Sequence, residues 1–302
     1  MRRIKTVLGE IRKPDAGITL VHEHVCCYSN SLYQMVGKDY LDKERLAAVA
    51  VDFLKSLKET YGLTTFVDCT PVNIGRDVAL LKEVSEKSGV HIVCATGFYY
   101  TDEPILHAAS PELLAGFMIA DAKKVNAGII KCAVEREELS PFDVKLLRAS
   151  AMAQLTLQLP IVLHTNAKNK NGLKALELLR SEGVKPQAIT VGHLSDTEDL
   201  EYVKQIAAHG CFIGFDRLYG KTSEDYVRQK LAAVTALCEA GCEDQLLLSH
   251  DALFFNGFEA TPAIKEAPRF SYCFDHILPR LSSRLAEKIM MENPAKMLTC
   301  GE

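Results

Sequence analysis

The chain has 302 residues, of which 48% are hydrophobic, and its formal net charge is −4. It contains no apolar run approaching the roughly 20 residues of a membrane-spanning helix, which argues against insertion into a bilayer. Its charged residues are scattered rather than blocked, so no basic stripe favours a nucleic-acid partner.

Short apolar runs rich in β-branched residues alternate with helical patterns along the whole chain. Their near-continuous apolar order is typical of parallel strands that are buried on both faces. In chain order, the predicted strands cover residues 17–24, 64–70, 91–99, 127–135, 160–166, 188–196, 211–216 and 245–252.

Most of these strands are separated by amphipathic segments, in which apolar residues recur at positions i, i+3 and i+4, as in a helix packed on a sheet. Several segments end at a glycine, for example Gly62 and Gly89, which is a common left-handed helix stop. In chain order, the predicted helices cover residues 43–62, 75–90, 143–158, 172–184, 196–210, 223–241 and 282–298.

Repeated strand–helix units of this kind predict an α/β fold, a (β/α)8 TIM barrel. No linker or low-complexity segment divides the chain, so a single domain over residues 1–302 is expected. A doubly wound open sheet is the alternative fold, but no glycine-rich dinucleotide motif follows the first strand.

Possible metal ligands fall where the predicted strands end, which is where barrel enzymes carry their reactive groups. His22 and His24 lie two apart, so both imidazoles are expected to face the barrel mouth while Glu23 points away. Such a pair alone is a weak signal, because a histidine at a strand end is often only hydrogen-bonded. The combination is specific, since other strands end in further candidates: Lys131, His164, His193 and Asp251.

Lys131 lies in the middle of the predicted strand 127–135, where an isolated ammonium would cost several kcal/mol to bury. One explanation is a salt bridge to Glu135 or Asp251. The other is that the neutral amine has taken up carbon dioxide, which would give a carbamate able to bridge two cations.

The ten cysteines do not form the dense pattern of a small secreted scaffold, and several, such as Cys69 and Cys94, lie in apolar runs. The first residues contain no apolar stretch followed by a small-residue cleavage site, so they do not read as a signal peptide. Both features favour a reducing, cytoplasmic location.

In their order and strand positions, these residues resemble the phosphotriesterase family of the amidohydrolase superfamily, from TLVHEH near the N-terminus to ENPAKML near the C-terminus. The resemblance implies an amidohydrolase-type TIM barrel, usually homodimeric, with two divalent metal ions per chain. Zinc is the usual metal, and cobalt, manganese or iron are possible. The implied ligands of the more buried ion are His22, His24 and Asp251, those of the more exposed ion are His164 and His193, and carboxylated Lys131 would bridge both.

Two further features resemble the lactonase branch of the family. The segment TGFYY places Tyr99 over the metal pair, and GFDRLYG places Arg217 after the seventh strand. The alternatives are an aromatic plug at the barrel rim for Tyr99 and a loop ion pair with Asp216 for Arg217. Asp196, three residues after His193, is either an outer carboxylate that supports the metal ligands or a helix N-cap.

The sequence therefore predicts a binuclear metal hydrolase, most closely a lactonase that opens a small lactone by attack of a metal-bridging hydroxide. Asp251 would act as general base, Tyr99 would donate a hydrogen bond to the developing oxyanion, and Arg217 would orient the substrate or its loop. His250 is expected to point to the opposite face as a packing residue. A phosphotriesterase or amide hydrolase would use the same ligands; a mononuclear deaminase and a non-catalytic metal-binding barrel are the remaining alternatives.

The substrate is left open by the sequence. The segment HDALFFNGF (250–258) suits an apolar acyl tail, as in an acyl-homoserine or alkyl lactone. A sugar or sugar-phosphate lactone would instead need cations, which loop residues on the expected side of the barrel offer: Lys168, Lys170, Arg217 and Lys221.

Overall fold

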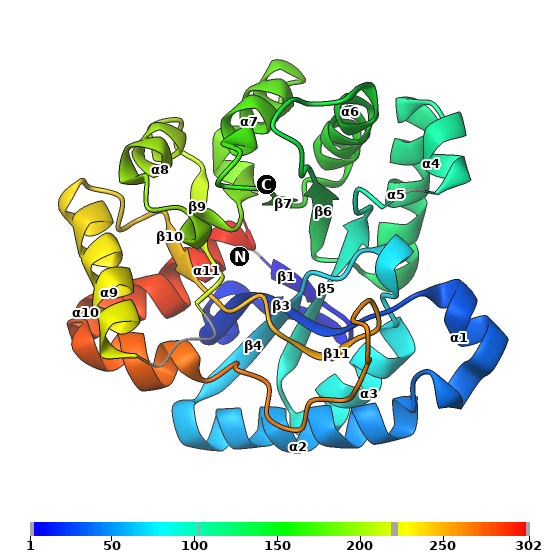
Figure 1. Ribbon diagram of the computed structural model, residues 1–302, viewed down its shortest axis with the longest axis horizontal. Helices are drawn as coiled ribbons and strands as arrows, with labels where there is room; N and C mark the ends of the chain where they lie inside the picture. The colour runs from blue at the N-terminus through cyan, green and yellow to red at the C-terminus, as the bar shows by residue number, and fades with distance from the viewer. Residues whose placement is uncertain (1–2, 102, 219–222, 300–302) are drawn as a thin grey trace.

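The computed structural model describes residues 3–101, 103–218 and 223–299. At its centre is a nine-stranded sheet in which every neighbouring pair is parallel, with helices arranged around it (Figure 1). The strands are β3 (Ile18–Cys27), β4 (Leu63–Asp68), β5 (His91–Gly97), β6 (Ile129–Ala133), β7 (Ile161–His164), β8 (Ile189–Val191), β9 (Phe212–Phe215), β10 (Leu246–Leu248) and β11 (Leu253–Asn256).

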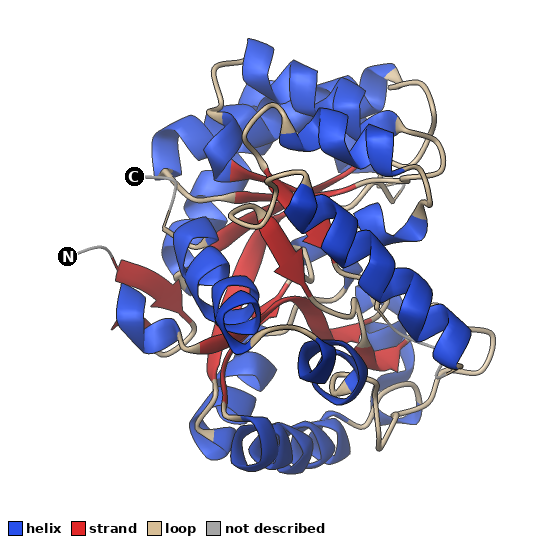
Figure 2. Cartoon of the chain, turned by 90° about the vertical axis from the view of Figure 1, so that its left-hand side faces the viewer, coloured by secondary structure: helices blue, strands red, loops and turns tan. Residues whose placement is uncertain are grey.

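The helices lie outside the strands, which run through the interior of the molecule (Figure 2). They are α1 (Asn30–Val36), α2 (Lys43–Tyr61), α3 (Val78–Ser88), α4 (Pro104–Ala108), α5 (Pro111–Val125), α6 (Pro141–Leu157), α7 (Asn171–Ser181), α8 (Leu200–Ala207), α9 (Glu224–Glu239), α10 (Ser283–Glu287) and α11 (Asn293–Met297). A π-helical segment, Lys288–Glu292, joins the last two helices.

The sheet closes on itself, because the segment after β10 is hydrogen-bonded to β3. The amide of Asp251 donates to the carbonyl of His22 at 3.0 Å, and the amide of His24 donates to the carbonyl of Ala252 at 3.0 Å. The fold is therefore a (β/α)8 barrel, as the sequence predicts, and the doubly wound alternative is wrong. Each predicted strand overlaps one of β3 to β10, and each predicted helix overlaps an observed one.

Several parts of the fold are absent from the sequence prediction, among them the short helices α1 and α4. A hairpin of β1 (Arg3–Thr6) and β2 (Gly9–Arg12) lies at the amino ends of the barrel strands, where the amide of Val7 donates to the carbonyl of Ile92 at 2.8 Å. Strand β11 follows β10 after a short break and pairs with β3, so it belongs to the segment that closes the barrel. Helix α5 is not predicted because large apolar residues, Leu113 and Phe117, are exposed on its outer face and blur its amphipathic pattern.

Apolar side chains fill the lower part of the barrel interior. Val21, Val67, Val93 and Val162 belong to one buried cluster there. The alternation of side chains along β6 places Lys131 on the same inner side as Ile129, so the lysine lies above this cluster. The barrel core therefore forms a packed floor under the polar residues at the strand ends.

A β-bulge in β3 sets the direction of its polar residues. The pairs that Leu20 and Glu23 make with β4 are three residues apart on β3 but only two apart on β4. Because of this extra residue, both Val21 and His22 face into the barrel, and Glu23 faces out of it. Without the bulge, the strand's alternation would turn His22 toward the surrounding helices.

None of the helices in the described part of the chain is both long and apolar enough to cross a membrane. The described cysteines are free thiols, most of them buried.

Candidate metal centre

Four of the predicted ligands line a cavity of about 490 Å³ at the carboxyl ends of the barrel strands: His24, Lys131, His164 and Asp251. His22, His193 and Asp251 offer atoms that all lie within 4.8 Å of one another. The predicted ligands come from β3 (His22 and His24), β6 (Lys131), the end of β7 (His164), and the residues that follow β8 (His193) and β10 (Asp251).

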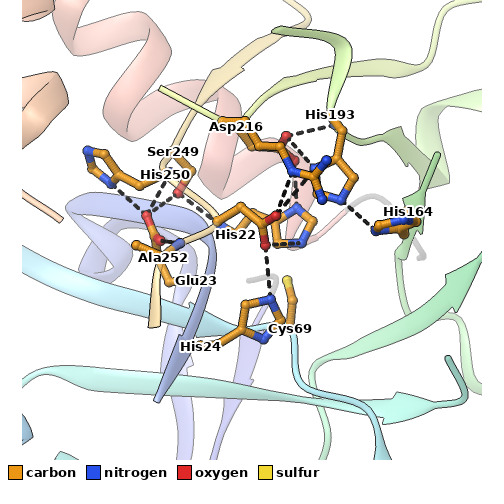
Figure 3. A network of polar contacts seen from close by, with 12 residues as sticks. His22, Glu23, His24, Cys69, His164, His193, Asp216, Ser249, His250 and Ala252 are labelled. Atoms are coloured by element: carbon orange, nitrogen blue, oxygen red, sulfur yellow. Dashed lines mark hydrogen bonds and ion pairs between the residues drawn. The ribbon is translucent and has the colours of Figure 1, made fainter. Parts of the chain in front are cut away.

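Asp216 orients two of these imidazoles at once (Figure 3). Its Oδ2 accepts from Nδ1 of His22 at 2.5 Å, and its Oδ1 accepts from Nδ1 of His193 at 3.0 Å. Although burial opposes it, the contacts with His193 and His22 hold the pKa of Asp216 below its usual value. The sequence prediction missed this role, although Asp216 stands at the end of a predicted strand, where a carboxylate is itself a signal.

The other two imidazoles also have outward partners. Thr70 donates its hydroxyl to the carbonyl of Cys26 at 3.2 Å, so it accepts from Nδ1 of His24 at 2.8 Å. Glu135 accepts from Nε2 of His164 at 3.1 Å, and this contact lowers the pKa of the Glu135 carboxyl. Each histidine therefore uses one ring nitrogen on an outer acceptor and turns the other nitrogen toward the cavity.

This arrangement fits metal ions well. Burial lowers the pKa values of His22, His164 and His193, that of His164 to about 4, so these rings are neutral near pH 7. With their N–H groups directed outward, Nε2 of His193 and Nδ1 of His164 present lone pairs to each other at 2.7 Å. Two lone pairs at this distance repel each other unless a cation lies between or beside them. The donor set of imidazoles and a carboxylate is that of zinc and related ions.

Lys131 is 1% exposed, and its Nζ lies 2.6 Å from Nε2 of His22. Within the described residues no ion pair joins it to a carboxylate. Glu135 is paired with His164, and Asp251 is paired with His24 and Arg217. The predicted salt bridge of Lys131 to Glu135 or Asp251 is therefore wrong, and the buried amine lies among the candidate ligands.

Tyr99 and Arg217 both line the cavity. The hydroxyl of Tyr99 lies 3.4 Å from Nε2 of His164, and burial raises its pKa, so it stays a hydrogen-bond donor at neutral pH. Arg217 donates from Nε to Asp251 Oδ2 at 2.7 Å and from Nη1 to Asp196 Oδ2 at 2.8 Å. The alternative ion pair of Arg217 with Asp216 is wrong.

Asp196 lies in the outer position that the sequence suggests, because it supports Arg217 rather than capping a helix. The N-cap of α8 is Asp199, which accepts from the amide of Tyr202 at 3.1 Å. Among the cations suggested for a sugar-phosphate lactone, Lys170 is paired with Asp199 at 2.7 Å, and Lys221 lies outside the described residues.

Comparison with known proteins adds to this geometry. A model of the phosphotriesterase family matches residues 2–298. The chain is 31% identical to an aryldialkylphosphatase from Saccharolobus solfataricus, over 96% of this chain and 97% of the relative. It is 31% identical to a phosphotriesterase homology protein from Mycobacterium tuberculosis, over 87% and 84% of the two chains. It is also 26% identical to an N-acetyltaurine hydrolase from Homo sapiens, over 98% of both.

Proposed function

The chain belongs to the phosphotriesterase family and is a metal-dependent hydrolase, and we propose that it is a lactonase with two divalent cations per chain, most suitably zinc. The observation that carries this proposal is the pair of neutral imidazoles of His164 and His193, whose lone pairs are directed at each other, together with a carboxylate and a buried lysine close by. A structural zinc site would close four ligands around one ion, whereas these ligands surround an open cavity.

In this proposal one ion would be held by His22, His24 and Asp251, and the other by His164 and His193. Carboxylated Lys131 would supply a ligand to both, which would explain why an amine without a carboxylate partner is buried at this position. The ions, when bound, supply a water that ionises near neutral pH and an electrophile for the substrate's carbonyl oxygen.

Asp251 is the proposed general base. Its side chain is 13% exposed and borders the cavity, so it can take a proton from the attacking water. When the ring C–O bond of the lactone breaks, Asp251 returns this proton to the alkoxide oxygen. Arg217 fixes the other side of the same carboxylate through Asp251 Oδ2, and Asp196 in turn fixes Arg217.

Tyr99 is the proposed donor to the substrate. Its hydroxyl borders the cavity beside His164 and remains protonated because burial raises its pKa. A hydrogen bond from it to the carbonyl oxygen would strengthen as negative charge develops there.

The surroundings of the site support a lactone that carries an acidic group. A second cavity of about 460 Å³ adjoins the first and shares Asp251, Leu253 and Asn256 with it. Lys265 and Arg269 line this second cavity. Lys265 is paired with Glu259 at 3.0 Å, whereas the exposed Arg269 side chain has no ion-pair partner among the described residues. A carboxylate or phosphate on the substrate would find its counter-charge there.

A hydrolysis screen tests the proposed activity. The zinc-loaded protein is expected to open γ- or δ-lactones, and to prefer those with a carboxylate or phosphate over neutral analogues, measured as kcat/KM by proton release. Paraoxon-like phosphotriesters and N-acyl amides form the comparison panel, since two relatives are named an aryldialkylphosphatase and an N-acetyltaurine hydrolase. Faster turnover of a phosphotriester or an amide than of every lactone would refute the lactonase assignment.

Replacing Arg269 tests whether this residue binds an acidic group of the substrate. Arg269→Ala is expected to raise KM about tenfold for the preferred acidic lactone and to leave kcat and the KM of neutral lactones unchanged, since one charge-assisted hydrogen bond contributes roughly 1.5–3 kcal/mol. Arg3→Ala, at the opposite end of the barrel, is the matched control. Equal KM values for acidic lactones in the two variants would remove Arg269 from substrate binding.

The homodimer and the cytoplasmic location that the sequence favours stay predictions.

A further inference from the structure

Glu23 lies between two candidate ligands in sequence, yet its side chain faces away from them and is fully buried (Figure 3). We propose that Glu23 is a positioning residue that holds Asp251 in the backbone conformation needed at the metal centre. The inference rests on the proposed function, because it assigns Asp251 to that centre.

All the hydrogen bonds of the Glu23 carboxylate come from the segment that carries Asp251. Its Oε1 accepts from the hydroxyl of Ser249 at 2.8 Å, and from the amide and Nδ1 of His250 at 2.9 and 2.7 Å. Its Oε2 accepts from the amide of Ala252 at 2.9 Å. A buried carboxylate is costly unless such donors surround it. Here the donors flank Asp251 on both sides.

Asp251 needs this support because its backbone is strained. Its φ is +51°, in the left-handed region that is unfavourable for residues other than glycine. Bonding the amides of His250 and Ala252 to one carboxylate fixes the chain on either side of that residue. The amide of Asp251 itself donates to the carbonyl of His22. Two groups of β3 therefore stabilise the strained conformation. The Glu23 carboxylate holds the amides on either side of Asp251, and the carbonyl of His22 holds the amide of Asp251 itself.

His250 forms part of the same support. Its Nδ1 donates to Glu23, and its Nε2 accepts from the amide of Cys273 at 3.0 Å. The prediction that His250 is a packing residue is thus incomplete, because both ring nitrogens are used in hydrogen bonds. The ring ties the segment before Asp251 to the chain that follows β11.

A second candidate ligand, His193, is held by a buried carboxylate in a similar way. His193 has a φ of +63°, and its amide donates to Oδ1 of Asp216 at 2.7 Å. In both places a buried carboxylate accepts a backbone amide at or next to a left-handed ligand residue: Asp216 from His193 itself, and Glu23 from the two neighbours of Asp251. The repetition supports a role for Glu23 in placing a ligand, beyond a general contribution to stability.

Glu23→Gln tests the proposal, because the amide keeps the size of the side chain but turns an NH2 group toward at least one of the four donors. We expect zinc affinity, measured by chelator competition, to fall about 10–100-fold, as is typical when the support of a metal ligand is lost. At saturating zinc, kcat should fall while KM stays unchanged, and a crystal structure should show Asp251 displaced. Asp143→Asn, at a buried carboxylate that caps α6, is the matched control and should leave zinc affinity unchanged.

Wild-type zinc affinity together with an unmoved Asp251 in Glu23→Gln would overturn the inference. If this variant does not fold, Glu23→Asp keeps the buried charge but withdraws it from its donors, and is expected to lower zinc affinity by a smaller factor in the same direction; no change there would overturn the proposal equally. A failure of the lactonase assignment is distinguishable, since zinc affinity is measured without any substrate.

Discussion

Treating the protein with a chelator is expected to abolish hydrolysis, and adding back zinc, cobalt or manganese is expected to restore it. The expectation follows from the site, where candidate ligands gather at one cavity and the lone pairs of His164 and His193 are directed at each other. The measurement is kcat/KM before chelation, after it, and after each metal is returned.

Elemental analysis of the restored protein adds a count of ions. Two ions per chain agree with the proposed pair, whereas one ion per chain would favour a mononuclear reaction. Circular dichroism controls for unfolding, because the loss of a bound ion also removes stability, about 4 kcal/mol when the free metal is a thousandfold above its Kd. Full activity in folded, metal-free protein would rule out the mechanism.

Replacing Lys131 is also expected to lower metal content and activity strongly. Lys131→Ala is expected to lose metal from the more exposed site and to lower kcat/KM by at least about a hundredfold, the upper end of the effects seen when only the support of a ligand is removed. Lys131→Glu should retain part of the bound metal and part of the activity, because its carboxylate replaces the carbamate oxygens. A short carboxylic acid such as propionate should partly rescue the alanine variant by occupying the space left beside His22.

The control for this series is Lys58→Ala, which removes a lysine that donates to the carbonyl of Gly89, on the outside of the barrel. If Lys131→Ala keeps two zinc ions per chain and normal activity, the lysine is not a ligand. If alanine and glutamate lower activity equally, the amine itself is required and the carbamate proposal fails.

Much of this site could be predicted because barrel chemistry is tied to strand ends. A histidine, lysine or aspartate that ends an apolar run is visible in the sequence, and parallel strands bring such ends together. His164 and Asp251 are far apart in the chain, yet both border one cavity.

The outer partners of the ligands were harder to predict, because their contacts depend on three-dimensional direction. Asp216 and Arg217 are neighbours in sequence, which suggested an ion pair between them. Their side chains diverge in the structure, so that Asp216 holds two imidazoles and Arg217 holds Asp251. No pattern of residue types alone gives that divergence.

Parts of the fold were also harder to predict, where the sequence shows no regular pattern. Helix α2 follows a regular apolar spacing and was predicted almost to the residue. Helix α5 was missed because its exposed face is not polar. The N-terminal hairpin was missed because its two four-residue strands are too short to show a period.

The bulge in β3 decides where this strand could lose a residue. Val21 is one of several similar apolar side chains in the barrel floor, and another aliphatic residue of like volume would fill its place. Deleting Val21 would remove the bulge and leave Leu20 and Glu23 two apart on β3, as their partners are on β4. Glu23 would then still point out of the barrel and both imidazoles into the cavity, with one aliphatic side chain fewer in the floor. The same deletion in a regular part of the strand would instead exchange the inner and outer faces of every residue beyond it.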